Sequence, residues 1–435
     1  MQKIQVFWFR RDLRLKDNRG LYEALLSGKK VLPLFIFDTQ ILDKLKDPSD
    51  ARVSFIHSRL EILNQELKSF GSSTWVAQGK PLSIWKQLVE DLNIDSVFTN
   101  QDYEPYARER DEALGEFLKQ KGIEFRTFKD QVIFEKNEVV KDDGKPYTVF
   151  TPYKRKWLST FQANSLESFP SLDLIIQGKG QLVQNIHHPF PSLSEIGFKK
   201  TLIHFPDIHY IPILKNYSQE RDFPAKPGTS RISVHLRFGT ISIRELVDAG
   251  IKGSDTWLSE LIWREFYFMI LWHFPNVHQS FRPEYDKIPW INSEKDFKKW
   301  CDGETGYPLV DAGMRELNET GFMHNRVRMV VASFLTKHLL IDWRWGEAYF
   351  AEKLLDFELS SNNGGWQWAA GCGVDAAPYF RIFNPYEQEK RFDPNHEYVK
   401  KWVKEWNTNR YPLPMVDHKY ARARCLDTYQ KALKE

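Results

Sequence analysis

Short apolar runs alternate with amphipathic stretches along the first third of the chain. Five runs have the length and the β-branched or aromatic content of strands: 4–9, 31–37, 73–76, 96–99 and 124–128. Between them, apolar residues recur at helical spacing near 18–27, 51–70, 81–92 and 105–121. This alternation predicts a doubly wound parallel sheet with helices on both faces, which makes the first domain an α/β domain.

The pattern changes after the fifth strand. Between about residues 159 and 217 the sequence is rich in Ser, Pro, Gly and His, which is typical of a long connector. After Gly228 the strand-like alternation does not return, and helical periodicity dominates to about Tyr349. We therefore expect an α/β domain over 1–130, a connector over 131–215 and an all-α domain over 216–435.

Composition indicates a folded protein outside the membrane. The chain has 435 residues, of which 42% are hydrophobic and 27% charged, and it contains no run of 18 uncharged apolar residues. The first apolar run ends in Arg10-Arg11-Asp12 without the features of a secretory signal, so a cytoplasmic protein is expected. Three distant cysteines and twelve scattered histidines show no metal-ligand spacing, so we expect reduced cysteines and no metal.

Charge and tryptophan content both depart locally from the average. From Val399 onward the chain has nine Lys or Arg against four acids, although the whole chain carries a net charge of only +3. This basic stretch favours a nucleic-acid surface and a solvated helix face about equally. Nine of the fifteen tryptophans fall between Trp257 and Trp368, which suits a dense core, a stacking pocket or a route for electrons.

A loop before the helical region combines hydroxyls, backbone N–H groups and an arginine. Residues 221–233 read RDFPAKPGTSRIS and lead into a predicted helix. A helix start of this kind can hold phosphate, although an ordinary helix cap explains the same residues. Neither G-x-G-x-x-G after the first strand nor G-x-x-x-x-G-K-[ST] occurs, so the sequence gives only weak support to a Rossmann or P-loop nucleotide site.

Charged and aromatic side chains share one side of a helix predicted over 257–267. Trp257, Glu260 and Arg264 fall on one helical face, and Trp263 lies on the adjoining face. A carboxylate, a guanidinium and two indoles on one side are unusual for a core face. This helix is therefore a candidate ligand-binding element.

Two further segments combine polar residues with helical or turn-forming patterns. The helix expected over 323–340 begins with His, Asn and Arg and continues as apolar sequence, so its polar start is expected to face a ligand. Residues 354–368 contain Asn-Asn-Gly-Gly, a run that is costly inside a helix. Packing alone does not explain the second segment.

With these motifs in place, the chain resembles the photolyase and cryptochrome flavoproteins over nearly its full length. It is most similar to class I cyclobutane-dimer photolyases. The resemblance begins at 6–14 (VFWFRRDLR) and includes five motifs in the same order: 229–233 (TSRIS), 260–266 (ELIWREF), 305–312 (TGYPLVDA), 323–326 (MHNR) and 362–368 (NNGGWQW).

The resemblance implies that the helical domain holds FAD in a U shape. The positions that match the family's cofactor contacts are Tyr217, Thr229, Ser230, Arg231, Ile232, Ser233, Trp257, Arg264, Arg328, Asp356, Phe357, Glu358 and Asn362. In the family, the 229–233 segment holds phosphates, Arg328 pairs with Asp356 beside the flavin ring, and Asn362 faces flavin N5. Glu358 departs from the pattern, because many members have Asp there.

The resemblance also implies light-driven repair, in which photoexcited reduced FAD passes an electron to a cyclobutane pyrimidine dimer flipped out of DNA. Trp263 and Trp368 match the aromatic walls of the lesion pocket, where stacking contributes roughly 1–3 kcal/mol per base. Glu260 and Asn325 match residues that hydrogen-bond the dimer, and Met329 matches one that packs against it.

Further matches concern DNA and electron transfer. Arg221 and Arg326 match contacts to phosphates of the damaged strand. Trp290, Trp343 and Trp366 match a chain of three indoles that passes electrons to FAD during photoreduction. The implied partner is ultraviolet-damaged DNA, and we expect the protein to act as a monomer.

Two family alternatives stay open beside dimer repair. One is a cryptochrome photoreceptor without repair activity, and the other is a photolyase for six-four photoproducts, whose histidine pair by the lesion fits Asn325 and Met329 less well. A scaffold with merely packed tryptophans does not explain five ordered motifs. Ala107 stands where folate-binding members have Glu, so folate, deazaflavin, flavin or no second chromophore are all compatible with the sequence.

Overall fold

The computed structural model describes residues 3–162, 166–186 and 188–434, and these form two compact units. The first unit consists of Met1–Glu138, Leu158–Phe205 and Ile232–Ala249. The second consists of Val139–Trp157, Pro206–Arg231 and Gly250–Glu435. Each unit is therefore assembled from three separate stretches of the chain.

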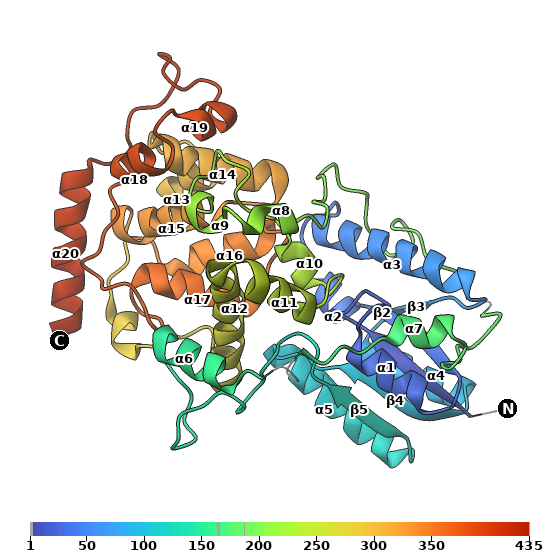
Figure 1. Ribbon diagram of the computed structural model, residues 1–435. Coiled ribbons are helices and arrows are strands. Elements are labelled where there is room, and N and C mark those ends of the chain that lie inside the picture. Colours follow the sequence, from blue (N-terminus) through green and yellow to red (C-terminus); the bar gives the residue numbers. More distant parts are fainter. Residues whose placement is uncertain (1–2, 163–165, 187, 435) are drawn as a thin grey trace. The chain divides into compact units, whose positions relative to one another are not determined.

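The first unit is built on a parallel five-stranded sheet in the order β3-β2-β1-β4-β5 (Figure 1). The strands are β1 (Ile4–Phe9), β2 (Val31–Asp38), β3 (Trp75–Gly79), β4 (Ile94–Asn100) and β5 (Glu124–Phe128). In the central strand, Phe7 pairs with Pro33 of β2 and Phe98 of β4. Every residue of β1 after Ile4 is buried, as expected for a strand covered on both faces. The predicted fold class is confirmed.

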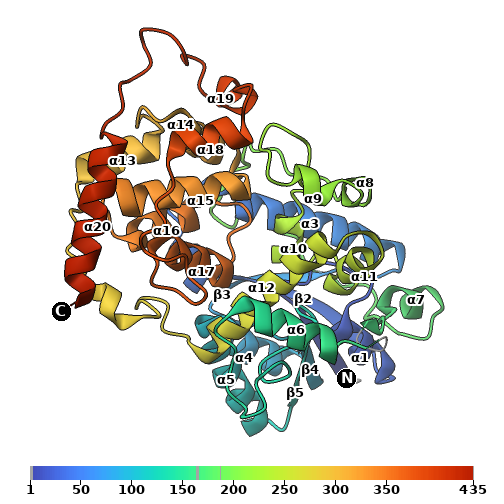
Figure 2. The same cartoon turned by 60° about the vertical axis from the view of Figure 1, so that its left-hand side comes forward.

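Local signals start the helices that link these strands. The helices are α1 (Arg19–Leu26), α2 (Thr39–Leu42), α3 (Ala51–Ser69), α4 (Pro81–Asp91) and α5 (Pro105–Gln120). Asn18 and Asp50 accept hydrogen bonds from first-turn N–H groups of α1 and α3, and Pro81 and Pro105 begin α4 and α5. α1 packs with α7 (Ser171–Ile176) and α4 packs with α5, on opposite sides of the strands (Figure 2).

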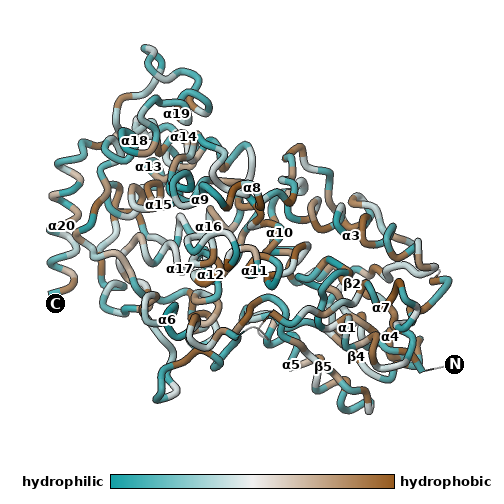
Figure 3. The backbone as a smooth tube through the Cα atoms, in the orientation of Figure 1, coloured by the Kyte–Doolittle hydropathy of each residue, from teal (hydrophilic) through white to brown (hydrophobic). Residues whose placement is uncertain are grey.

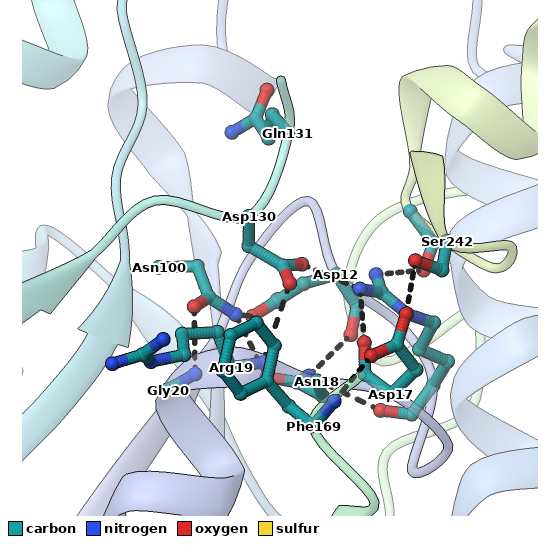
Figure 4. Close-up of polar contacts among 12 residues, drawn as sticks. Asp12, Asp17, Asn18, Arg19, Gly20, Asn100, Asp130, Gln131, Phe169 and Ser242 are labelled. Atoms are coloured by element: carbon teal, nitrogen blue, oxygen red, sulfur yellow. Dashed lines mark hydrogen bonds and ion pairs between the residues drawn. The ribbon is translucent and has the colours of Figure 1, made fainter. Parts of the chain in front are cut away.

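Buried ion pairs tie distant stretches of the first unit together, and Figure 4 shows two of their acids, Asp17 and Asp130, with Ser242 donating a hydrogen bond to Asp17. Asp130 accepts hydrogen bonds from Arg14 at 2.6 Å and Arg244 at 2.8 Å, and Arg244 also donates to Asp17 at 2.9 Å. Burial favours a higher carboxyl pKa, yet the two guanidiniums outweigh it and hold the pKa of Asp130 below its ordinary value. This cluster fixes the start of α11 (Ile243–Gly253) to the first unit.

The compact units differ from the ranges expected from the sequence. Residues 232–249 fall in the expected helical range 216–435, whereas the buried contacts of Arg244 place them in the first unit. Residues 139–157 fall in the expected connector 131–215, whereas they belong to the second unit. The expected connector also contains the helices α6 (Phe150–Thr160) and α7, and its residues 163–165 and 187 lie outside the described residues.

The second unit is helical. Its elements are α8 (Ile211–Leu214), α9 (Tyr217–Glu220), α12 (Asp255–His273), η2 (Pro283–Lys287), α13 (Glu294–Asp302), α14 (Pro308–Thr320), α15 (Asn325–Ser333), η3 (Phe334–His338), α16 (Trp343–Lys353), α17 (Leu359–Ala370), α18 (Pro385–Phe392), α19 (Glu397–Trp402) and α20 (His418–Lys434). α17 packs against α12, α15 and α16, which makes it the central helix. Hydrophilic and hydrophobic residues alternate along the basic helix α20 (Figure 3), and Ala421, Cys425 and Tyr429, spaced four residues apart, are buried. The predicted all-α character of this part is confirmed.

Two segments differ in detail from their predicted form. The single helix expected over 323–340 is α15 followed by a π-helical turn, η3, which buries Lys337 and His338. The Asn-Asn-Gly-Gly run lies inside α17, although its residues are poor helix formers. Tertiary packing around α17 therefore outweighs local propensity at this point.

Cysteine, metal and membrane features can be stated for the described residues. Cys301, Cys372 and Cys425 are buried and form no disulfide. No group of three or more His, Cys, Asp or Glu is arranged to hold a metal ion in the described ranges. In the same ranges, every helix is too short or too polar to cross a membrane.

Candidate functional site

Helix α12 presents an aromatic and charged face within the second unit. Ser254 caps the helix by accepting a hydrogen bond from the N–H of Trp257. The Trp257 ring is 4% exposed and meets Tyr217 edge-on at 5.3 Å and Tyr210 in a stacked arrangement at 5.9 Å between ring centroids. Tyr217 and Trp257, expected to contact one ligand, are thus brought together.

Glu260, one turn further along α12, is part of a row of four alternating charges. Its carboxylate accepts a hydrogen bond from Arg221, and Asp222 forms an ion pair with Arg326 at 2.9 Å. Arg221 and Asp222 also lie 4.0 Å apart. The structure therefore joins one expected lesion contact, Glu260, to both expected phosphate contacts, Arg221 and Arg326.

The two expected aromatic walls are held differently. Trp263 stacks on Phe150 with ring centroids 3.6 Å apart and planes within 9° of parallel, so α6 supports one face of this indole. Trp368 on α17 is half-buried and lies 6.5 Å from Phe383. Both tryptophans belong to helices that pack against each other, because α12 packs on α17.

The start of α15 carries the other expected lesion contacts. His324 caps this helix by accepting a hydrogen bond from the N–H of Arg326, and burial lowers the pKa of His324 to about 4. The imidazole is therefore neutral near pH 7. Asn325 is exposed, and the sulfur of Met329 lies 3.9 Å from a guanidinium nitrogen of Arg326. The start of the helix therefore exposes Asn325, and its contact with a ligand stays a prediction.

Two ion pairs fix the charged residues expected beside a flavin. Arg328 donates to both carboxylate oxygens of Asp356, at 3.1 and 3.0 Å, and to the backbone oxygen of Met323. Arg264 lies 3.9 Å from Glu358, which is 7% exposed. Glu358 therefore meets a charged partner even though the family more often has Asp there. Phe357, between the two acids, packs against the hydrophobic core of this unit.

Asn362 on α17 is oriented by a residue that the sequence reasoning missed. Its amide nitrogen donates to the backbone oxygen of Glu347 at 3.1 Å and to the Glu347 carboxylate at 3.0 Å. Burial raises the pKa of Glu347. With its nitrogen used in this way, the amide of Asn362 keeps its carbonyl oxygen available for another donor.

The expected phosphate loop is split between the two units. Thr229, Ser230 and Arg231 belong to the second unit, whereas Ile232 and Ser233 fall in the first. Arg231 has a left-handed backbone with φ of 54° and lies 3.4 Å from buried Glu316. A non-glycine residue in this conformation is a feature found often at ligand sites.

The three expected electron-transfer tryptophans occupy one helical core. Trp366 on α17 is 2% exposed and Trp343 on the adjacent helix α16 is 1% exposed, while Trp290 is partly buried beside Tyr429. The ring of Trp366 lies 6.0 Å from that of Trp300 and 5.0 Å from that of Phe350, measured between ring centroids. Trp300 lies in the tryptophan-rich stretch but carries no motif that would single it out.

The donors and acceptors of this unit fit a bound flavin nucleotide. In the described residues, the hydroxyls of Thr229 and Ser230 make no hydrogen bond, and the buried hydroxyl of Ser360 has no partner. Hydroxyls with unused capacity beside an arginine suit phosphate, and an amide oxygen such as that of Asn362 suits a ring N–H. These unused groups would satisfy a ligand that has both chemistries.

The missed residues share one cause. Asp222 and Glu316 are separated from their arginine partners by 85 residues or more, and Glu347 lies on a different helix from Asn362. Only Asp222 gave a local signal, since it follows Arg221 within the same loop. Pairing of such distant residues is set by tertiary packing and not by sequence spacing.

Comparison with known proteins covers the whole chain. Family models described as DNA photolyase and FAD binding domain of DNA photolyase match residues 5–173 and 257–409. The deoxyribodipyrimidine photo-lyase of Vibrio cholerae is 36% identical, with 99% of this chain and 100% of the relative covered. The deoxyribodipyrimidine photo-lyase of Escherichia coli is 35% identical, with 98% of each chain covered.

Solved structures give the same result. A bacterial class III photolyase from Agrobacterium tumefaciens has a TM-score of 0.88 and 34% identity, with 100% of this chain and 98% of that chain covered. An archaeal photolyase from Sulfolobus tokodaii, solved with two FAD molecules, has a TM-score of 0.83 and 33% identity over 98% and 99% of the chains.

Proposed function

The chain belongs to the DNA photolyase family, and from this premise we propose that it uses light to split cyclobutane pyrimidine dimers in DNA. The observation that carries the proposal is that proteins named deoxyribodipyrimidine photo-lyase match this chain at 35–37% identity over 95% of its length or more. The reaction class is that of a carbon–carbon lyase, because the two bonds that join the pyrimidines are broken.

FAD is the cofactor of this proposal. Reduced FAD, when bound and excited by light, supplies the electron for the reaction. Thr229, Ser230 and Arg231 would hold its phosphates, with Ile232 and Ser233 as the adjoining loop residues, and Tyr217 and Trp257 would pack against it. Around the ring, Arg328 with Asp356, Arg264 with Glu358, and Phe357 would set the electrostatic surroundings, and Asn362 would accept a hydrogen bond. The unused hydroxyls and the fixed amide described above support these assignments.

The lesion would bind to partly buried and exposed side chains of three helices. Glu260 and Trp263 lie on α12, Asn325 and Met329 on α15, and Trp368 on α17, which packs against both other helices. Extrusion of a dinucleotide costs a few kcal/mol, and stacking on two indoles contributes roughly 1–3 kcal/mol per base in return. The indoles and the polar groups of Glu260 and Asn325 would hold the dimer in place for electron transfer.

Two aspects of the partners and setting stay predictions. We expect a monomer that works in the cytoplasm on ultraviolet-damaged DNA. Sedimentation of the purified protein and fractionation of cells that express it would check both. A second chromophore would add an absorption band beside that of FAD, and extraction with mass spectrometry would distinguish folate, deazaflavin, flavin or none.

One experiment tests the proposed activity. The purified protein is scanned for flavin absorption, reduced, and mixed with DNA that contains either a cyclobutane dimer or a six-four photoproduct, with blue light and in darkness. We expect repair of the cyclobutane dimer in light alone. Repair of only the six-four lesion would indicate the second family alternative, and flavin binding without any repair would indicate a photoreceptor.

Glu260→Ala tests the assigned lesion contact. Loss of the carboxylate removes an acceptor for the dimer, so the repair yield is expected to fall severalfold while FAD absorption is unchanged. Glu284→Ala, at an exposed position on η2, is the matched control and should repair normally. An unchanged yield in Glu260→Ala would contradict its role.

A further inference from the structure

Two arginines proposed to contact DNA are already neutralised within the protein. We call Glu260, Arg221, Asp222 and Arg326 the charge row. Arg221 donates to Glu260, and Asp222 pairs with Arg326 at 2.9 Å and lies 4.0 Å from Arg221. Two acids and two guanidiniums alternate, so the net charge of the row is zero.

The positions in the row differ in exposure. The side chains of Arg221 and Arg326 are 18% and 19% exposed, whereas those of Asp222 and Glu260 are 38% and 35% exposed. Cation–π contacts also restrain the arginines, since the guanidinium of Arg221 lies over the ring of Tyr217 and that of Arg326 over the ring of Phe392. An approaching strand therefore meets two fixed guanidiniums together with two carboxylates.

This arrangement weakens attraction to an ordinary duplex. Non-specific binding of DNA depends on the number of phosphates that Lys and Arg neutralise. Each arginine in the charge row has an internal acid as partner, and a phosphate beside Asp222 is repelled by it. An undamaged strand has no extruded dimer to contact Glu260, so no new interaction compensates for breaking these ion pairs.

A damaged strand changes the balance at Glu260. If Glu260 hydrogen-bonds the extruded dimer, its bond to Arg221 weakens, and Arg221 needs another anionic partner. Asp222 already lies 4.0 Å from the Arg221 guanidinium, and a backbone phosphate is the other acceptor available. Asp222 can thus form an ion pair with Arg221 while it remains paired with Arg326. Both arginines then keep their positions next to the strand.

From these contacts we propose that Asp222 is a specificity residue. It suppresses binding to undamaged DNA, and it becomes the ion-pair partner of Arg221 when a bound dimer takes the place of Arg221 at Glu260. The inference rests on the proposed function, because it assumes that the row faces damaged DNA. Asp222 is a positioning residue in this scheme, since it acts through Arg221 and Arg326.

Asp222→Asn removes the charge and keeps the shape. Undamaged duplex is expected to bind about fivefold more tightly, the size of effect that a partly exposed ion pair produces. The slope of log K against log salt is expected to steepen by about one, because one more phosphate contact becomes available. Binding of dimer-containing duplex should improve less, so that the ratio of the two affinities falls. Both are measured in darkness by fluorescence anisotropy over a salt series.

Asp286→Asn is the matched control. Asp286 pairs with Arg344 at 2.6 Å and is 35% exposed, so this variant makes the same charge change in a similar ion pair on η2. It should leave both the affinity ratio and the salt slope at their original values. Flavin absorption and thermal unfolding show that each variant is folded and carries its cofactor.

The outcomes separate this inference from the proposed function. If the unchanged protein repairs dimers and prefers damaged duplex, but Asp222→Asn raises both affinities equally or changes neither, the role of Asp222 is wrong and the proposed function stands. An equal effect of Asp286→Asn would also overturn it, since net charge would then explain the result. If the unchanged protein neither prefers dimer-containing duplex nor repairs dimers, both proposals are wrong.

Discussion

At the scale of single residues, hydrogen-bond partners set the orientation of each functional side chain and which of its atoms are available to a ligand. The amide of Asn362 is the clearest example, because two acceptors on Glu347 hold its nitrogen and leave its oxygen for a ligand. Glu260 is a second example, since its bond to Arg221 means that it must exchange partners before it can contact a dimer. The sequence motif supplies the side chain, and a distant neighbour sets its orientation.

Trp366→Phe tests the proposed electron route at this scale. Phenylalanine fills most of the buried site but is far harder to oxidise than an indole, so photoreduction of oxidised FAD is expected to be largely lost. Repair by enzyme that has been reduced chemically should continue. Both are followed by flavin absorbance and by dimer content. Trp85→Phe, in the core of the first unit, is the control, and equal photoreduction in the two variants would contradict the assignment of Trp366.

At the scale of elements, α17 shows why a poor helix sequence forms a helix. A Cβ on Gly364 would lie 2.2 Å from a ring carbon of Tyr267 on α12, so only glycine allows these helices to approach so closely. A Cβ on Gly365 would meet nothing within 4 Å, and this residue is exposed. The two adjacent glycines therefore have different reasons to be present.

Alanine at these two positions is expected to act in opposite directions. Gly365→Ala should raise the free energy of unfolding by about 1 kcal/mol, because alanine is the better helix former. Gly364→Ala should lower it by about 1–3 kcal/mol, because the methyl group overpacks the contact with Tyr267. Denaturant unfolding of the two flavin-loaded variants measures the difference. Destabilisation of similar size in both would show that the helix contact is not the cause.

At the scale of the whole molecule, buried charges join segments that are far apart in the sequence. In the first unit, Asp130, labelled in Figure 4, accepts hydrogen bonds from Arg14, near the start of the chain, and from Arg244, in its middle. A buried pair of this kind is strongly destabilising when one partner is lost, since the other charge is left without compensation. The fold of this unit therefore depends on residues that a continuous domain boundary would separate.

Asp130→Asn tests this dependence and predicts a pH effect. The change should lower the free energy of unfolding by about 3–5 kcal/mol at neutral pH. Because the folded pKa of Asp130 is below its unfolded value of about 4, its contribution is complete above that value and is lost as the pH falls toward the folded pKa. Unfolding measured at pH 7 and at successively lower pH should show a shallower acid loss in the variant.

The control for this experiment is Asp143→Asn, at an exposed position. Its unfolding free energy should stay within about 0.5 kcal/mol of the original at neutral pH, as for surface substitutions in general. If the two variants have the same stability at pH 7, the buried cluster does not hold the first unit together.

The strands of the first unit, most of the helices that link them and the family can be recognised from the sequence alone. Strands and helices follow from local periodicity, and the capping residue Asn18 and the first-turn residue Pro105 mark helix starts. The five ordered motifs supply the residue types for a flavin and a lesion because chemistry requires those types. All of this information is carried by neighbours along the chain.

The assignment of segments to the two units and the pairing of distant charges depend on long-range packing. Residues 232–249 belong to the first unit because Arg244 finds Asp17 and Asp130, more than 110 positions away. The partners of Arg326 and Asn362, which are Asp222 and Glu347, are likewise fixed by packing. Such pairs depend on the distance between folded elements, a quantity that spacing along one chain does not contain.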